Sequence, residues 1–224
     1  GKGSERKKMF PDYKSNRGNK SPEEMEQVRV VGSQIDKLRL KILPKLGYRN
    51  VFWKDGYEAD DLIAALVHQH AGKDVGEAVI VSTDKDLYQL VRDPDVWMWN
   101  PRTKEAITEE TIKAEHGVGP KDWPFVKALA GCKSDAVPGV PGVGEKTAVK
   151  YLTGKCGAGT VRRIKEQGQR VLDRNLPLVT LPLPGVGEYE LSEDEVTTKR
   201  WRGFCVAYGM ESLVRLNPNG RLPI

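Results

Sequence analysis

The sequence predicts an α/β fold in which a mostly parallel sheet with flanking helices is followed by a helical subdomain. Two observations support this prediction. Short apolar runs typical of strands alternate with helical patterns up to about residue 118, and only helical patterns follow. We therefore expect two domains. The first, at 1–118, is an α/β core that includes a basic segment and a long helix, and the second, at 119–224, is a helical subdomain with a C-terminal tail.

The long helix is predicted near the start of the chain. Ser21 supplies a cap and Pro22 a favourable first position, and acidic residues follow in the first turn. Apolar residues then recur every three or four positions before a stop at Gly47: Met25, Val28, Val31, Ile35, Leu38, Ile42 and Leu46. The preceding residues 1–21 are basic and poor in aliphatic side chains, so we expect them to be irregular or mobile until a partner orders them.

The other elements follow from local patterns. In the core they are strands at 50–53, 78–82 and 96–99 and helices at 60–71, 87–91 and 108–116. In the second part they are helices at 122–130, 145–152, 160–167 and 169–175, followed by a surface loop at 176–195 that is rich in Pro and Gly. The strand at 78–82 is apolar almost throughout, which is typical of a buried parallel strand.

Composition and charge narrow the function classes. Hydrophobic residues make up 38% of the 224 residues and charged residues 30%, which fits a globular chain and excludes a disordered one. Three widely spaced cysteines without a CxxC pair argue against a zinc ribbon or a disulfide framework. The net charge is +7 over 1–50, −6 over 51–100 and +4 over 101–224. An acidic middle between basic flanks fits either ordinary surface variation or a metal site framed by polyanion-binding surfaces.

Two acidic clusters lie where an α/β sheet places its functional groups. Glu58, Asp60 and Asp61 precede the helix at 60–71, and Asp84 and Asp86 follow the strand at 78–82. Each cluster alone fits a helix cap equally well. Together they favour an oxygen-rich site for Mg²⁺ or Mn²⁺.

Two further segments suit a phosphate backbone. The loop at 138–148 combines close glycines with the start of a helix, which binds phosphate without reading bases, although most glycine turns are only turns. It lacks the spacing of a P-loop. The segment at 11–17 places Lys14 and Arg17 beside Tyr13, a pattern that fits phosphate clamping and base stacking or a plain solvated basic loop.

In this order, the motifs PDYKSNR, GYEADD, STDKD and AGCKSDAVPGVPGVGEKTA resemble the 5′-nuclease family, which comprises flap endonucleases and 5′→3′ exonucleases of bacteria and bacteriophages. The family includes the nuclease domain attached to bacterial DNA polymerase I. The resemblance runs from about residue 9 to about residue 154 and implies a PIN-like core followed by a helix-hairpin-helix subdomain.

The resemblance also implies roles for individual residues. Glu58, Asp60 and Asp61 match acids at a first divalent metal, Asp84 and Asp86 match acids between two metal positions, and Asp135 matches an acid of the second. Lys14 and Arg17 match a basic pair at the scissile phosphate, and Tyr13 resembles an aromatic that stacks near the substrate. The loop at 138–148 resembles a hairpin that grips duplex DNA and binds K⁺ through carbonyls; its residues are Gly139, Val140, Gly142, Gly144, Lys146 and Thr147.

Two departures from the family pattern bear on the chemistry. Two further metal-ligand Asp residues are expected on strands that would lie upstream of Gly1, so we expect this chain to lack an N-terminal portion. The acid expected after Gly131 is Cys132, and a thiol is a poor ligand for Mg²⁺. We therefore expect a weakened second metal site.

The resulting expectation is a metal-dependent 5′-nuclease that hydrolyses DNA phosphodiester bonds near 5′ ends or at flap junctions. The alternatives are a DNA-binding module that keeps the hairpin but has lost catalysis, and a Mg²⁺-dependent RNase of similar topology. The expected partners are duplex DNA with a 5′ end or flap and a DNA polymerase or other replication proteins, without a membrane. We expect a monomer in the cytoplasm of a bacterial or phage-infected cell.

Overall fold

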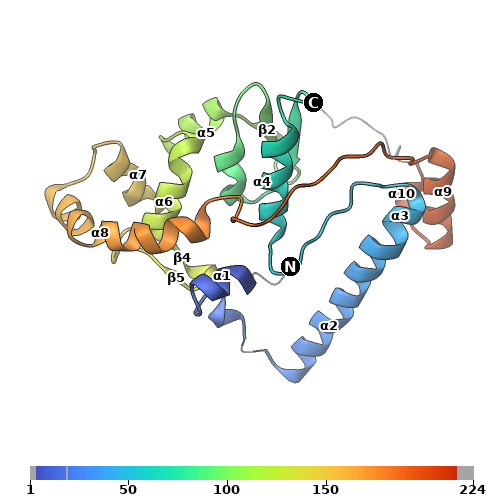
Figure 1. The fold of residues 1–224 in the computed structure, drawn as a ribbon, viewed down its shortest axis with the longest axis horizontal. Helices are drawn as coiled ribbons and strands as arrows, with labels where there is room; N and C mark the ends of the chain where they lie inside the picture. Colours follow the sequence, from blue (N-terminus) through green and yellow to red (C-terminus); the bar gives the residue numbers. More distant parts are fainter. Residues whose placement is uncertain (1–3, 19, 216–224) are drawn as a thin grey trace. The chain divides into compact units, whose positions relative to one another are not determined.

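The computed structural model describes residues 4–18 and 20–215. The chain divides into two compact units, shown with their elements in Figure 1. Unit 1 contains Gly1–Gly18 and Trp53–Tyr189, and unit 2 contains Asn19–Phe52 and Glu190–Ile224. The predicted domain boundary near residue 118 lies inside unit 1 and stays a prediction.

Unit 1 contains a sheet of mixed direction. Its described strands are β1 (Ala78–Val81), β2 (Val96–Asn100) and β3 (Glu105–Ile107), in the order β1-β2-β3. β1 pairs with β2 in parallel, with Ala78 opposite Val96, and β2 pairs with β3 antiparallel. The mixed α/β class is thus confirmed, and β3 is an antiparallel strand that the sequence did not predict.

Helices connect and flank these strands. They are α4 (Ala59–His70), the 3₁₀ helix η3 (Lys85–Leu90) and α5 (Glu109–His116), close to the predicted bounds. The predicted strand at 50–53 is wrong, because no described strand forms there. Instead, the Asn50 side chain donates to the Ser192 carbonyl and accepts from the Ser192 amide. These contacts come from a side chain, whereas a strand needs hydrogen bonds between backbones.

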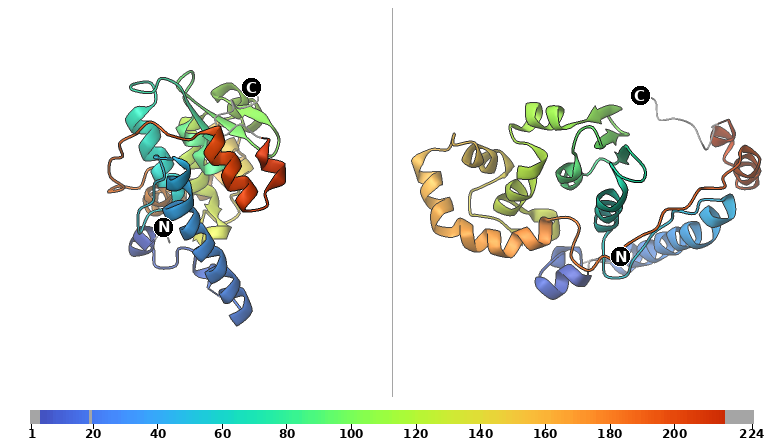
Figure 2. Two further views of the ribbon diagram at one scale, coloured as in Figure 1. Left: turned by 90° about the vertical axis from the view of Figure 1, so that its right-hand side faces the viewer. Right: turned by 45° about the horizontal axis from the view of Figure 1, so that its top comes forward.

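The helical part of unit 1 is built around α6 (Trp123–Ala130). This helix packs against both α7 (Glu145–Leu152) and α8 (Ala158–Val179), as the turned views of Figure 2 show. Between α6 and α7, a short hairpin pairs β4 (Gly131–Cys132) with β5 (Val137–Pro138), and the 3₁₀ helix η5 (Lys133–Asp135) joins them. A further 3₁₀ turn, η4 (Pro120–Asp122), precedes α6.

The sequence predicted two short helices where the structure has the single helix α8. Gly168, the position between the two predicted helices, lies inside α8 and is buried. A Cβ at this position would lie 3.0 Å from Ile164 Cγ2 and 3.6 Å from Leu129 Cδ2, so the glycine allows close packing on α6. The predicted surface loop after it is also partly wrong, since α8 continues to Val179 and Leu183 is only 2% exposed.

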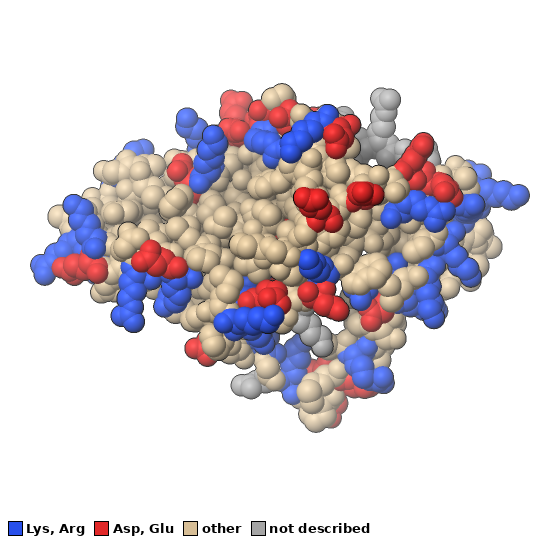
Figure 3. Space-filling view, in the orientation of Figure 1, with Lys and Arg blue, Asp and Glu red and all other residues tan. Residues whose placement is uncertain are grey.

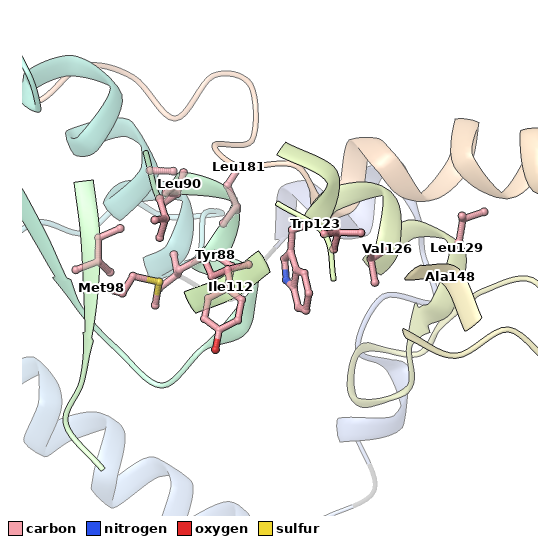
Figure 4. Close-up of a cluster of buried hydrophobic side chains, with 14 of the residues drawn as sticks. Tyr88, Leu90, Met98, Ile112, Trp123, Val126, Leu129, Ala148 and Leu181 are labelled. Atoms are coloured by element: carbon pink, nitrogen blue, oxygen red, sulfur yellow. The ribbon is translucent and has the colours of Figure 1, made fainter. Parts of the chain in front are cut away.

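One apolar core joins the sheet to the helices that follow it. Figure 4 shows side chains from η3, β2 and α5 together with side chains of α6 and α7. Tyr88, His116 and Trp123 form a group of three rings with centroids 5.0–5.6 Å apart. This shared core holds the loops at the end of β1 and the hairpin after α6 in fixed positions.

The N-terminal segment differs from its prediction. Residues 4–18 were expected to be irregular, but they form α1 (Ser4–Met9) and the 3₁₀ helix η1 (Ser15–Arg17). Arg6 is 3% exposed and Tyr13 is 4% exposed. Tyr13 and Phe10 pack in a small apolar cluster with Val137 and Leu178, and polar partners far along the chain, described below, add to this anchoring. Residues 1–3 and 19 lie outside the described residues.

Unit 2 contains the predicted long helix in three sections. α2 (Pro22–Lys37) starts at the Ser21–Glu24 capping box, η2 (Leu38–Ile42) is a π-helical turn, and α3 (Leu43–Leu46) ends at Gly47, whose φ is 104°. Pro44 has no N–H for the carbonyl four residues before it, which accounts for the widened turn. The unit also contains α9 (Thr198–Ala207) and α10 (Glu211–Val214).

The surface carries both charge signs. Lys and Arg side chains are interspersed with Asp and Glu over the face seen in Figure 3. Within the described part of the chain, no helix combines the length and the apolar character that crossing a bilayer requires.

Candidate active site

A cleft of about 590 Å³ in unit 1 gathers most of the predicted site residues. Its lining includes Tyr13, Lys14, Arg17, Glu58, Asp60, Asp84, Asp86 and Asp135. Asp61 is not among the lining residues, and neither are the predicted loop residues between Gly139 and Thr147. The structure therefore places the acids and the basic pair together, and the loop at 138–148 reaches this cleft through Glu145.

Local structure explains why the two acidic clusters face this cleft. Glu58 is the N-cap of α4, and Asp60 lies in its first turn. Asp84 follows β1 and caps η3, its Oδ1 accepting from the Asp86 amide at 2.9 Å. The carboxyl end of a parallel strand and the N-terminus of a helix are thus brought together, as open α/β sheets generally arrange their sites.

Asp61 turns away from the cleft into a buried ion pair. Arg6 donates to both of its carboxylate oxygens, at 2.6 and 2.8 Å, and both side chains are almost fully buried. The amide of Leu183 donates to Oδ1 at 2.9 Å and the amide of Glu58 donates to Oδ2 at 3.0 Å. These partners hold the pKa of Asp61 below its ordinary value despite burial. Its oxygens are already saturated, which leaves little capacity for a metal ion.

Glu58 is contacted by three groups from the N-terminal segment, of which Arg6 Nη1 lies 3.8 Å from Oε2. The Tyr13 hydroxyl donates to Oε2 at 2.9 Å, and the Lys14 ammonium contacts Oε1. Burial and the negative charge of Glu58 raise the pKa of Tyr13 far above its ordinary value. With its ring buried, Tyr13 supports the carboxylate, and its predicted role as a stacking platform stays a prediction.

The predicted basic pair closes over Asp135. Arg17 donates to Asp135 Oδ1 at 2.7 Å, and Lys14 Nζ lies 3.8 Å from the same atom. The Lys14 amide donates to the Asp135 carbonyl at 2.7 Å, and its φ of 55° is left-handed. A lysine in this backbone region is unusual and is kept only where its surroundings enforce it.

Asp60 and Asp84 differ from the acids around them. Among the described residues, neither makes an ion pair with a basic group, although both line the cleft. Burial, followed by the charges of Asp84, Asp86 and Glu58, raises the pKa of Asp60 from 3.8 to about 6. This mutual repulsion is what an added cation relieves.

Asp86 faces a lysine that the sequence analysis missed. Lys127 Nζ of α6 lies 2.9 Å from Asp86 Oδ1 and 3.3 Å from Glu145 Oε1. Burial raises the pKa of Asp86. Burial alone would lower the pKa of Lys127, but the negative charges of Asp86 and Glu145 outweigh burial and raise it. No local signal marked Lys127, or Arg6, because their partners are distant in the sequence.

No ready-made cage for a metal ion is present among the described His, Cys, Asp and Glu side chains. The donor set accounts for this, since Glu58, Asp61, Asp86 and Asp135 are engaged by basic groups of the protein. Cys132 lines the cleft, with its sulfur 3.1 Å from Ser134 Oγ. Asp60 and Asp84 offer the oxygen ligands that Mg²⁺ or Mn²⁺ prefers, whereas the Cys132 thiol is a poor ligand for Mg²⁺ and the Lys127 ammonium is no ligand at all.

The glycine loop is rigidly built. Gly139 crosses α6 so closely that a Cβ would lie 2.3 Å from the Ala130 carbonyl. Val140 is 2% exposed, and its amide donates to Leu129 at 2.8 Å, so only its backbone could meet a ligand. Gly142, with φ 74°, and Gly144, the N-cap of α7, are exposed.

The helix that follows completes the loop. Lys146 is exposed and Thr147 is half-buried in the first turn of α7. First-turn amides of a helix can face an anion when they have no other acceptor, but the Thr147 amide already donates to the Gly144 carbonyl at 2.9 Å. Behind the loop, the fully buried Asn175 donates to the carbonyls of Ala128 and Pro138, at 2.8 and 3.0 Å. These hydrogen bonds fix the backbone on both sides of the short hairpin that leads into the loop.

The fold and the acidic cleft are those of a nuclease-like α/β protein, and the comparisons specify the family. The family model described as "5'-3' exonuclease, N-terminal resolvase-like domain" matches residues 1–117, more than half of the chain. The chain belongs to this 5′-3′ exonuclease family.

Similar proteins of known sequence or structure also include 5′-exonucleases and a flap endonuclease. A 5′-3′ exonuclease of Aquifex aeolicus is 34% identical over 203 residues, covering 88% of this chain and 66% of the relative. The T5 5′-exonuclease, solved with divalent zinc ions, superimposes with a TM-score of 0.66 at 23% identity, over 80% of this chain and 70% of that one. The bacteriophage T5 flap endonuclease, solved with DNA and metal ions, gives 0.59 at 23% identity, over 79% and 70%.

The chain also matches longer proteins over part of their length. It is 38% identical over 151 residues to DNA polymerase I of Mycobacterium bovis, covering 66% of this chain. It spans only 16% of that polymerase.

Proposed function

We propose that the chain is a divalent-metal-dependent 5′-nuclease that hydrolyses phosphodiester bonds of DNA near 5′ ends or flap junctions. The observation that carries this proposal is a pair of acids, Asp60 and Asp84, that have no basic partner in the described part of the chain and lie in the same cleft as Lys14 and Arg17. A cation-seeking group beside anion-seeking groups suits a metal ion and a phosphate together.

In this proposal Mg²⁺ or Mn²⁺ is held by Asp60 and Asp84. A bound ion of this kind would polarise a phosphoryl oxygen and lower the pKa of a bound water. Lys14 and Arg17 would leave Asp135 and Glu58 to bind phosphate oxygens, with their positive charge placed where negative charge develops. The second metal site of the sequence-based expectation is weakened by Cys132.

Duplex DNA is the proposed partner, held by the exposed residues of the loop at 138–148. Gly142, Gly144 and Lys146 would meet the phosphate backbone, so binding would depend on structure more than on sequence. K⁺ at this loop would need carbonyls other than that of Pro141, which already accepts from Arg163 at 3.0 Å. A DNA polymerase or another replication protein is a proposed partner, and a cytoplasmic monomer is the proposed state.

The alternative is a DNA-binding module without catalysis. A nuclease assay on flap, nicked and single-stranded DNA with Mg²⁺ or Mn²⁺ separates the two. The proposal expects cleavage that Asp60→Asn lowers at least a hundredfold while duplex binding persists. Binding without cleavage at any metal concentration would favour the alternative.

A second arm tests the loop. A Cβ at Gly144 has no described heavy atom within 4 Å, so Gly144→Ala leaves the fold intact and obstructs only a ligand. We expect duplex affinity to fall about tenfold and to decline with added salt. Gly159→Ala, equally open in space, is the matched control and should bind as the parent does. Unchanged affinity in Gly144→Ala would remove the loop from the proposed interface.

A further inference from the structure

The two sides of the cleft are neutralised in different ways. On one side, Asp60 and Asp84 have no basic partner among the described residues. On the other, Asp86 and Glu145 share Lys127, and Asp135 is engaged by Arg17.

Lys127 is fixed in this place by its surroundings. Its side chain is 13% exposed, and its Nζ lies 2.9 Å from Asp86 Oδ1 and 3.3 Å from Glu145 Oε1. It projects from α6, which the core packs on several sides, so the ammonium group has little freedom to withdraw. Two carboxylates around one ammonium form a small cation site that the protein itself already fills.

The remaining donors on this side do not favour a metal ion either. Cys132 offers sulfur, a poor ligand for Mg²⁺. A divalent ion sharing Asp86 with Lys127 would be repelled by the ammonium at close range, where charges interact strongly. The loss of an acid at 132 and the presence of a cation at 127 act in the same direction.

We propose that the ammonium group of Lys127 is a resident cation in place of a second divalent ion, so that this cleft takes up one divalent ion where the family resemblance implies two. The role that this inference gives to the bound ion rests on the proposed nuclease function. One metal ion and one lysine would together supply the positive charge that a phosphate in the cleft requires. Lys127 then determines how many divalent ions the cleft binds. Its direct effect is on the affinity for metal ions, and any effect on the rate of cleavage follows from that.

The test counts metal ions on the full chain. Mn²⁺ is titrated and followed by calorimetry and by the electron paramagnetic resonance signal of free Mn²⁺, with Asp60→Asn identifying ions bound in the cleft. The parent is expected to bind one Mn²⁺ that Asp60→Asn abolishes. Lys121→Met, which removes an exposed lysine just before α6, should leave that number unchanged.

The decisive comparison uses two double variants that differ only at position 127, where one carries a positive charge and the other does not. Lys127→Met with Cys132→Asp is expected to bind a second Mn²⁺ at least tenfold more tightly than Lys127→Arg with Cys132→Asp, because arginine keeps the positive charge. If the Met variant loses its fold by circular dichroism, Lys127→Gln with Cys132→Asp takes its place. Equal affinities in the pair, two cleft ions in the parent or none at all would each overturn the inference.

The same proteins keep this inference separate from the proposed function. If one ion binds and the charge-dependent second ion appears, but no DNA is cleaved, the inference stands and the nuclease proposal fails. If the parent cleaves DNA and binds two ions in the cleft, the nuclease proposal stands and Lys127 has no such role.

Discussion

Asp60 and Asp61 are neighbours in the sequence, yet they lie in opposite environments. Asp61 is fully buried, meets Arg6 through two hydrogen bonds and has a lowered pKa. Asp60 lines the cleft, lacks a basic partner among the described residues and has a pKa raised to about 6. One turn of α4 therefore presents an acid held in a buried ion pair on one side and an acid that faces the cleft on the other.

The difference teaches how the chain separates stability from chemistry. A buried carboxylate with all its oxygens satisfied holds segments together but has nothing left for a ligand. A carboxylate kept near other carboxylates lowers the stability of the empty protein and is ready for a cation. Sequence motifs treat both acids alike, and only their partners distinguish them.

Removing Arg6 should have the largest effect. Arg6→Met leaves Asp61 buried without its counter-ion, and breaking such a pair lowers stability by about 3–5 kcal/mol. Urea denaturation at pH 7 measures the loss. Arg29→Met breaks the exposed pair with Glu26 on α2 and should leave the midpoint unchanged within error. Comparable losses in the two variants would mean that burial does not distinguish these pairs.

Metal affinity should separate the two acids next. Asp60→Asn removes an oxygen ligand with its charge, and we expect Mn²⁺ affinity to fall roughly a hundredfold, about 2.7 kcal/mol. Asp61→Asn, assayed under conditions where it stays folded, should change affinity less than about threefold, because its oxygens face Arg6. Calorimetric titration reports both values, and the reverse order would assign the ligand role to Asp61.

The raised pKa of Asp60 predicts a pH dependence of metal binding. Because the pKa is about 6, roughly nine in ten Asp60 carboxyls hold a proton at pH 5 and few do at pH 7. A proton and a cation compete for the same group, so Mn²⁺ affinity should fall about tenfold from pH 7 to pH 5. Constant affinity across this range would show that Asp60 is not the titrating ligand.

The smallest predicted effect is on the stability of the metal-free protein. A raised pKa in the folded state means that Asp60 favours folding below about pH 4 and that this contribution is lost as pH rises to about 6. Asp61, with a lowered pKa, has the opposite slope and loses its contribution as pH falls. Asp60→Asn should therefore raise the melting temperature at pH 7 by about 2–4 °C, or about 1 kcal/mol. Melting curves in a chelator from pH 4 to pH 8 test the sign.

Local patterns predicted the elements whose signals are local. The bounds of α7 follow from Gly144 and the spacing after it, and the start of α2 follows from Ser21 and Pro22. The strand at 50–53 failed because apolar composition cannot reveal whether a neighbouring strand exists. The break at Gly168 failed because a buried glycine serves packing against α6 as readily as it ends a helix.

The sequence could predict the acids of the site, but it could not predict which basic residues pair with them. Motif spacing brought Glu58, Asp60, Asp84 and Asp86 forward, and the structure places all four at one cleft. Motif spacing could not show that Arg6 forms an ion pair with Asp61, because 55 residues separate them. Nor could it show that Lys127 contacts Asp86, since a lysine on a helix is ordinary until the tertiary fold places an acid beside it.

The buried guanidinium of Arg6 also has a consequence during synthesis on the ribosome. It donates to Asp61 and to the carbonyl of Leu178, which lies 172 residues further along the chain. At translation speeds of 5–20 residues per second, about 10–35 seconds pass between the emergence of the two partners. Throughout that interval the N-terminal segment lacks its final partner. The hydrogen bond that ties the N-terminal segment to the end of α8 therefore forms only after α8 has been made.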